Sequence, residues 1–121
     1  MDIKNNNNSE KLVKTVIDGM QEIKAKNIFV LNLTKLDNAI TDYFVICDAE
    51  STTQVNAISD SVEITVKKQL NDNLLHKEGT ENASWIVLDY SNVIVHVFQS
   101  EAREFYNIED FWADAELRKI E

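Results

Sequence analysis

The side chains of this chain that are able to do chemistry are two histidines, one cysteine and a few aspartates. His76 and His96 are twenty residues apart, and neither has a cysteine or a second histidine beside it at the spacing of a zinc site. Cys47 lies in an apolar segment, which is typical of a small buried residue rather than of a nucleophile. We therefore expect neither a metal site nor cysteine chemistry from these residues.

Three aspartates near expected strand ends suggest a second kind of chemistry. Asp42, Asp48 and Asp89 could hold magnesium for phosphoryl transfer, because carboxylates at strand ends bind this ion in such enzymes. A triphosphate also needs backbone donors from a glycine-rich turn, and the chain has only two glycines and no G-x-G-x-x-G or Walker-type loop. Solvated carboxylates are the favoured interpretation, so we expect no enzyme and no cofactor. A nucleotide-transferring enzyme remains the alternative.

A hairpin near the C-terminus carries the most informative pattern. Two apolar runs, residues 85–89 and 93–98, lie on either side of Tyr90-Ser91-Asn92. If Ser91 and Asn92 are the two central residues of a tight turn, the pairing of residues across the two strands is fixed. On one face the expected pairs are Tyr90 with Val93, Leu88 with Val95 and Ile86 with Val97. On the other face they are Asp89 with Ile94, Val87 with His96 and Trp85 with Phe98. The first face is expected to pack on helices.

The second face mixes aromatic and polar side chains, which is typical of protein-binding patches. Trp85, Asp89, His96 and Phe98 form the predicted patch, and Arg103 follows closely enough to reach it. The alternative is a covered sheet in which His96 and Asp89 satisfy each other, with Arg103 in a local ion pair. For Phe105 and Trp112 we expect packing roles.

The elements that position these residues follow from the apolar pattern. Apolar residues recur every three or four positions after Ser9 and again after Ser51 or Thr52, which predicts two helices. Strands are expected at residues 28–33, 43–47, 85–89 and 93–98, with a short extended piece before Gly79 and helical segments from 101 to about 117. This order predicts a single α/β (α+β) domain of two layers, a mixed β-sheet with helices, over residues 9–117. Residues 1–8 are expected to form a disordered tail.

The charge balance narrows the class of partner. Twenty-one acidic residues against twelve basic ones give a formal net charge of −9, which is unsuited to nonspecific binding of nucleic acid. A basic protein is the easier partner because complementary charge speeds the encounter. With one cysteine, no secretory signal and no apolar run of about 20 residues, the chain is expected to be cytoplasmic and without a membrane span.

Several motifs also occur in a definite order along the chain. They are Thr41-Asp42-Tyr43-Phe44-Val45-Ile46, Gln54-Val55-x-Ala57-Ile58, Glu78-Gly79, Trp85-Ile-Val-Leu-Asp89-Tyr90, Val93-Ile-Val-His96-Val-Phe98, Glu101-x-Arg103-x-Phe105-Tyr106 and Phe111-Trp112-Ala-Asp114-Ala115. Together they resemble the ribosomal silencing factor family, also called Iojap-like, from about Leu12 to Ala115. The chain departs from the family pattern at Ser91, where glycine is usual, at Thr53, where a basic residue is common, and in lacking a proline before the hairpin.

The resemblance implies a fold related to nucleotidyltransferases but without their catalytic residues. It implies binding to the large ribosomal subunit through a basic ribosomal protein, large-subunit protein fourteen, with little direct contact to nucleic acid. Small-subunit joining would be blocked sterically, repressing translation when nutrients are scarce. A homodimeric adaptor that uses the mixed face as its own contact is a further alternative. The residues expected to bind the partner are Asp42, Tyr43, Trp85, Asp89, His96, Phe98, Glu101 and Arg103.

Overall fold

The protein is described from a computed structural model that places residues 2–120, with side chains from Asn8 to Ile120. Its centre is a six-stranded sheet with strand order β3-β4-β5-β2-β1-β6. The strands are β1 (Lys26–Asn32), β2 (Tyr43–Ala49), β3 (His76–Glu78), β4 (Trp85–Asp89), β5 (Val93–Gln99) and β6 (Glu116–Lys119). β2 and β5 are parallel and all other neighbours are antiparallel, so the sheet is mixed as predicted.

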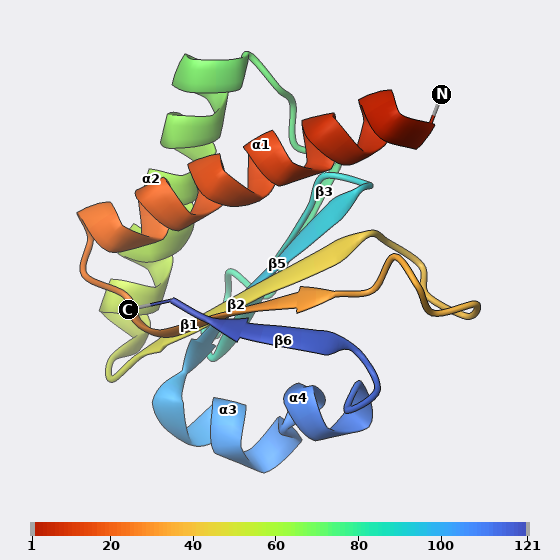
Figure 1. Ribbon diagram of the computed structural model, residues 1–121. Helices are drawn as coiled ribbons and strands as arrows, with labels where there is room; N and C mark the ends of the chain where they lie inside the picture. The colour runs from red at the N-terminus through yellow and green to blue at the C-terminus, as the bar shows by residue number, and fades with distance from the viewer. Residues whose placement is uncertain (1, 121) are drawn as a thin grey trace.

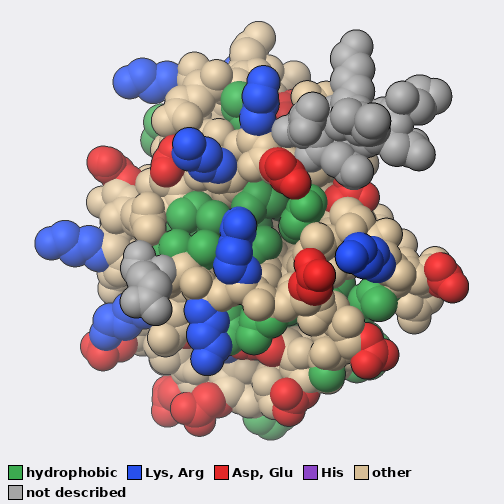
Figure 2. Space-filling view, in the orientation of Figure 1, with side chains coloured by type: hydrophobic (Ala, Val, Ile, Leu, Met, Phe, Trp, Pro, Cys, Tyr) green, Lys and Arg blue, Asp and Glu red, His purple; other side chains and the backbone are tan. Residues whose placement is uncertain are grey.

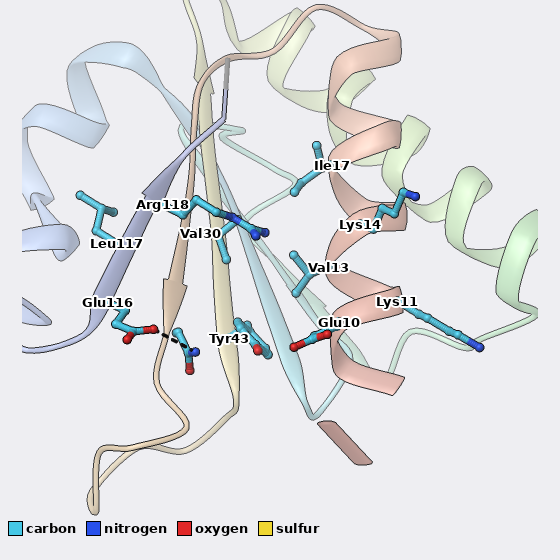
Figure 3. Close-up of a pocket in the computed structure, with 11 residues that line it drawn as sticks. Glu10, Lys11, Val13, Lys14, Ile17, Val30, Tyr43, Glu116, Leu117 and Arg118 are labelled. Carbon is cyan, nitrogen blue, oxygen red and sulfur yellow. Dashed lines mark hydrogen bonds between the residues drawn. The ribbon is translucent and has the colours of Figure 1, made fainter. Parts of the chain in front are cut away.

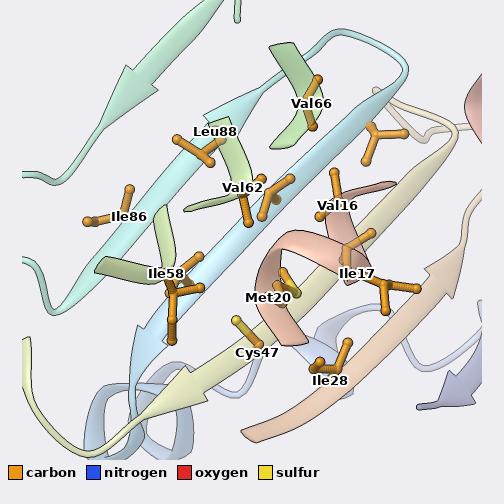
Figure 4. Packing of buried hydrophobic residues seen from close by; sticks show 14 of the residues in the cluster. Val16, Ile17, Met20, Ile28, Cys47, Ile58, Val62, Val66, Ile86 and Leu88 are labelled. Atoms are coloured by element: carbon orange, nitrogen blue, oxygen red, sulfur yellow. The ribbon is translucent and has the colours of Figure 1, made fainter. Parts of the chain in front are cut away.

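Two long helices, α1 (Asp2–Glu22) and α2 (Thr52–Leu70), cover one face of the sheet (Figure 1). Their apolar stripes interdigitate with the β-branched side chains of the strands beneath (Figure 4). Ser51 caps α2 by accepting a hydrogen bond from the backbone N–H of Gln54 at 3.1 Å, which confirms this predicted helix start. The resulting layer is the main hydrophobic core of the domain.

The predicted hairpin register is confirmed pair by pair. Trp85 lies opposite Phe98, Val87 opposite His96 and Asp89 opposite Ile94. Ser91 occupies the turn with a φ of +78°, a left-handed conformation that favours glycine. The side chain of Asp89 stabilises the turn by accepting a hydrogen bond from the Ser91 N–H at 2.7 Å.

The other face of the sheet is covered by two short helices, α3 (Ser100–Tyr106) and α4 (Ile108–Phe111), seen below the sheet in Figure 1. A smaller apolar cluster lies between them and the sheet, built around Phe44, Ile46 and Phe98. The predicted α+β domain with a mixed sheet is therefore confirmed, and this second, partial helical cover is an addition to the two layers expected.

Both ends of the folded chain differ from the prediction. α1 begins at Asp2 and includes the backbone of residues 2–8, which were expected to form a tail. Ser9 lies inside α1, and its hydroxyl donates to Asp42 rather than capping the helix.

Residues 116–119 form β6, where helical structure to about residue 117 was predicted. The sequence of this exposed strand does not alternate between apolar and polar residues. Its extended conformation is therefore set by its pairing with the outer edge of β1. In the described part of the chain, no helix combines the length and apolar character needed to cross a bilayer.

Candidate docking surface

The mixed face of the hairpin is largely covered, contrary to the prediction that it forms an exposed patch. His96 is 6% exposed and Phe98 is fully buried, because α3 and α4 fold back over this part of the sheet. Trp85 remains half-buried at the margin, stacked on Phe98 with ring centroids 4.8 Å apart. The aromatic composition of this face therefore serves mainly to build the second apolar cluster.

The alternative of a covered sheet is therefore confirmed, but the pairing of His96 with Asp89 that it included is wrong. His96 Nδ1 accepts a hydrogen bond from the indole Nε1 of Trp85 at 3.1 Å, and Asp89 is occupied by the turn. Burial lowers the pKa of His96 to about 3, so the ring is neutral at physiological pH.

Arg103 is buried and takes part in an ion-pair network, not in a surface around Trp85. Its guanidinium donates to Asp48 Oδ2 at 3.0 Å and to Glu109 Oε2 at 2.9 Å, and it lies 4.5 Å from the centroid of the Phe29 ring. It also donates to the backbone carbonyl of Asn27. The predicted local ion pair is thus confirmed. The network fastens α3 and α4 to β1 and β2.

The three aspartates considered for magnesium serve three separate purposes. Asp48 pairs with Arg103, Asp42 accepts a hydrogen bond from Ser9 at 2.8 Å, and Asp89 holds the hairpin turn. Asp42 and Asp48 flank opposite ends of β2. Among the described residues no group of three or more histidine, cysteine or carboxylate side chains could hold a metal ion. The geometry gives no support to phosphoryl transfer at these positions.

The remaining predicted residues lie at different places on the molecule. Tyr43 is half-buried at the start of β2, and its pKa is raised by burial and by the nearby carboxylates of Glu10 and Asp42. Glu101 is exposed on the first turn of α3. The predicted set therefore does not form one surface.

The structure exposes a different aromatic group on α3 and α4. Phe105 and Phe111 are each 80% exposed and Tyr106 is 51% exposed. Tyr106 contacts Trp85 with ring centroids 4.8 Å apart and Phe105 at 5.0 Å. These three rings are in contact, and Phe111 lies on the following helix, α4; we call Trp85, Phe105, Tyr106 and Phe111 the aromatic surface.

Sequence reasoning assigned Phe105 to packing, and this was wrong. Phe105 is two positions beyond the buried Arg103, which places it on the outward side of the helix. The packing role of Trp112 is confirmed by its edge contact with Phe44, with ring centroids 5.8 Å apart. Helical phase relative to Arg103 is the signal that could have revealed Phe105.

Acidic residues surround the aromatic surface. Residues 100–115 contain five acidic side chains and one basic one, and the basic one is the buried Arg103. Glu101, Glu104, Asp110 and Asp114 are exposed. Large exposed aromatic rings within a field of negative charge are suited to a partner that offers apolar contacts and basic side chains.

The sequence and the fold both match known proteins. Residues 6–121 match the family model described as "Ribosomal silencing factor during starvation". The chain belongs to this family. It is 31% identical to the ribosomal silencing factor RsfS of Halalkalibacterium halodurans over 113 residues, covering 93% of this chain and 95% of that protein. It is 37% identical to the chloroplastic protein Iojap of Zea mays over 94 residues, covering 78% of this chain and 40% of that protein.

Solved structures of bacterial proteins share the fold of this family member. A crystal structure of a Chromobacterium violaceum protein has a TM-score of 0.81 at 29% identity and covers 86% of this chain and 85% of its own. A second, from Bacillus halodurans, has a TM-score of 0.76 at 28% identity, covering 93% and 98%. The family resemblance drawn from the motifs is therefore confirmed.

Proposed function

We propose that this chain is a ribosomal silencing factor that binds the large ribosomal subunit and prevents the small subunit from joining it. The observation that carries the proposal is membership of the ribosomal silencing factor family, whose model matches residues 6–121. The proposed contact is large-subunit protein fourteen, the partner that the family resemblance implies. The acidic side chains that border the aromatic surface are suited to a basic protein of this kind.

The aromatic surface supplies the apolar part of this contact. Fully burying a phenylalanine side chain is worth roughly 1.5–3 kcal/mol, and Phe105 and Phe111 expose most of their surface in the free protein. Trp85 is partly held by Phe98 and Tyr106, so it presents a rigid edge that loses little conformational freedom on binding.

In this proposal, activity depends on the fraction of large subunits that have the protein bound. The bound protein excludes the small subunit by its volume, so the effect depends on affinity and concentration, with no chemical step. Repression of translation then follows the fraction of large subunits that carry the protein.

The first test is sedimentation with isolated large subunits. We expect co-migration of the wild-type protein and loss of joined ribosomes when small subunits are added. Phe105→Ser and Phe111→Ser together should weaken binding by about 2 kcal/mol or more, roughly thirtyfold in Kd, because both rings are exposed and available as anchors.

The control is Ile64→Ser, which removes another well-exposed apolar side chain, 64% exposed, from α2 on the opposite side of the sheet. It should bind as wild type, and circular dichroism should show all three proteins folded. The proposal would be contradicted if the wild-type protein at micromolar concentration stayed at the top of the gradient and did not sediment with the large subunit. Equal binding by the Phe105 and Phe111 variant would move the contact elsewhere.

The homodimeric adaptor is distinguished by light scattering of the protein alone and with the isolated partner protein. If the aromatic surface is a contact between copies, the free protein is a dimer and the serine variant is a monomer. If the surface serves the ribosomal protein, the serine substitutions leave the mass of the free protein unchanged.

A further inference from the structure

The helical layer over the main core is narrower than the sheet it covers. Six strands at about 4.8 Å spacing span roughly 25–29 Å, whereas two helices of about 10 Å diameter span about 20 Å. α1 packs on β2, β5 and β1, and α2 packs on β5, β4 and β2. The strip over β6 and the outer side of β1 is therefore left without a helix in the described part of the chain.

A groove of about 1030 Å³ occupies this strip, between α1 on one side and β1, β2 and β6 on the other (Figure 3). Its apolar floor is formed by Val13 and Ile17 of α1 and by Val30 of β1, all three of which belong to the main core. Figure 2 shows hydrophobic side chains gathered between α1 and β6 on this face, with basic side chains over and beside them. The floor of the groove is thus the outer edge of the main core, where Val13, Ile17 and Val30 are 3–8% exposed.

The groove also has an unusual charge for so acidic a protein. Lys11, Lys14 and Arg118 line it, are exposed, and form no ion pair with any residue that the structure describes. Glu10 and Glu116 lie at the Tyr43 end, where Glu116 accepts a hydrogen bond from Asn32 at 3.4 Å and lies 3.9 Å from Lys35. The guanidinium of Arg118 reaches across the middle of the groove toward α1.

We propose that this groove is a second docking site, distinct from the aromatic surface, and that its occupant is an acidic amphipathic helix of a partner protein. A helix beside α1 would complete the layer as its third member, with apolar side chains on Val13, Ile17 and Val30. Acidic side chains along its flank would meet Lys11, Lys14 and Arg118.

A helix fits this site better than an added strand does. A strand on the free edge of β6 would gain backbone hydrogen bonds but would leave the apolar floor uncovered. The groove residues of α1 extend from Glu10 to Ile17, about two turns, so a docking helix of three to four turns would cover them. Because α3 and α4 lie on the opposite face of the sheet, both sites can be occupied at once (Figure 1).

The test uses a synthetic probe of about 18 residues, an amphipathic helix with leucine at positions i, i+3, i+4 and i+7 and glutamate on its flanks. We expect it to shift the backbone amide resonances of Val13, Val30 and Arg118 in the ¹⁵N-labelled full-length protein. A matched peptide with lysine in place of each glutamate should bind at least tenfold more weakly.

Charge reversal supplies the second arm. Lys14→Glu with Arg118→Glu should weaken binding of the acidic peptide at least tenfold, since the Arg118 guanidinium crosses the groove and Lys14 lines it from α1 (Figure 3). Lys24→Glu with Lys68→Glu, an equal change of net charge at exposed positions outside the groove, should leave it unchanged.

Four results would overturn the proposal. The first three are absence of binding at millimolar peptide, equal binding of the acidic and basic peptides, and resonance shifts confined to Phe105 and Tyr106. A free protein that is a dimer, and that Lys14→Glu with Arg118→Glu turns into a monomer, would make a second copy the occupant and would likewise overturn it. Each result is independent of sedimentation with the large subunit, so failure here leaves the proposed ribosomal function standing.

Discussion

His96 lies directly beneath the aromatic surface, and the protonation state of its ring affects the stability of the fold. Because Nδ1 accepts the hydrogen bond from Trp85, the neutral ring carries its proton on Nε2. Nε2 is buried and finds no hydrogen-bond partner among the described residues. Protonation of the ring would remove the acceptor that orients the Trp85 indole and would place a charge in an apolar cluster.

This arrangement predicts a loss of stability in mild acid. The pKa of His96 is about 3 in the folded state and about 6.5 in the unfolded state, so below pH 6.5 the unfolded chain binds a proton that the folded chain does not. The free energy of unfolding should fall by about 1.4 kcal/mol per pH unit from this group, or about 2 kcal/mol between pH 7 and pH 5.

Urea unfolding of wild type and His96→Gln at both pH values measures this contribution. Glutamine retains an acceptor for Trp85 but does not titrate, so the difference in stability between the two proteins should shrink by about 2 kcal/mol at pH 5. Parallel pH curves for the two proteins would contradict the assignment.

Residue patterns in the sequence predicted which residues are neighbours in the sheet far better than they predicted which side chains are exposed. The turn at Ser91 fixed the pairs from Trp85–Phe98 to Tyr90–Val93, because side-chain alternation and turn geometry are local properties. Whether the mixed face met solvent depended on where α3 and α4 lie, and the Arg103 network that holds them joins residues up to 76 positions apart. No local pattern in the sequence contains that information.

At the scale of elements, α1 and α2 cross in unusually close contact at Gly19. A Cβ added there would lie 2.8 Å from the Cα of Val62 and 3.2 Å from the carbonyl oxygen of Ser61. The Ser61 hydroxyl donates to the Gly19 carbonyl at 2.8 Å, which ties the two backbones together. Glycine is therefore required at this crossing by the neighbouring helix, although it is a poor helix former.

Gly19→Ala should lower the free energy of unfolding despite the better helix propensity of alanine. Propensity favours alanine by about 1 kcal/mol, whereas forcing a methyl group against the backbone of α2 costs about 1–3 kcal/mol. Chemical denaturation should show a net loss of about 1 kcal/mol. Gln21→Ala, an exposed position of the same helix, should show no loss, and a stabilised Gly19→Ala protein would mean that the helices can separate freely.

The elements that the sequence missed share a physical cause. β6 has four exposed residues and no apolar alternation, so the unpaired edge of β1 determines its structure. The asparagine run of α1 was predicted as a tail on composition, yet its backbone continues the helix that the apolar stripe after Ser9 establishes. In both cases the neighbouring element outweighs the weak preference of the segment itself.

For the whole molecule, the net charge of −9 is distributed so that the two proposed sites attract partners of opposite charge: basic at the aromatic surface and acidic at the groove. The aromatic surface lies among exposed carboxylates, and the groove is lined by three cations that pair with no residue the structure describes. Local charge rather than the total is expected to guide each encounter, because salt at physiological concentration screens charges beyond about 8 Å.

Charge reversal at two exposed glutamates, one at a time, shows whether the association rate depends on the charge near the aromatic surface or on the total charge of the protein. Glu104→Lys and Glu81→Lys change the net charge equally, but only Glu104 lies on α3 beside the aromatic surface. Stopped-flow association with isolated large-subunit protein fourteen should slow about threefold or more for Glu104→Lys. Equal slowing by both variants would show that the total charge governs the encounter.

The parallel pairing of β2 with β5 has a consequence for how the chain folds during its own synthesis. Tyr43 pairs with Val93, fifty residues later, and β5 supplies the only neighbour of β2 on that side. A nascent chain that has reached the end of α2 at Leu70 already contains α1, β1 and β2, but one edge of β2 has no partner. Such long-range pairing is slow to form and exposes apolar surface meanwhile. The centre of the sheet can therefore close only after β5 has been translated.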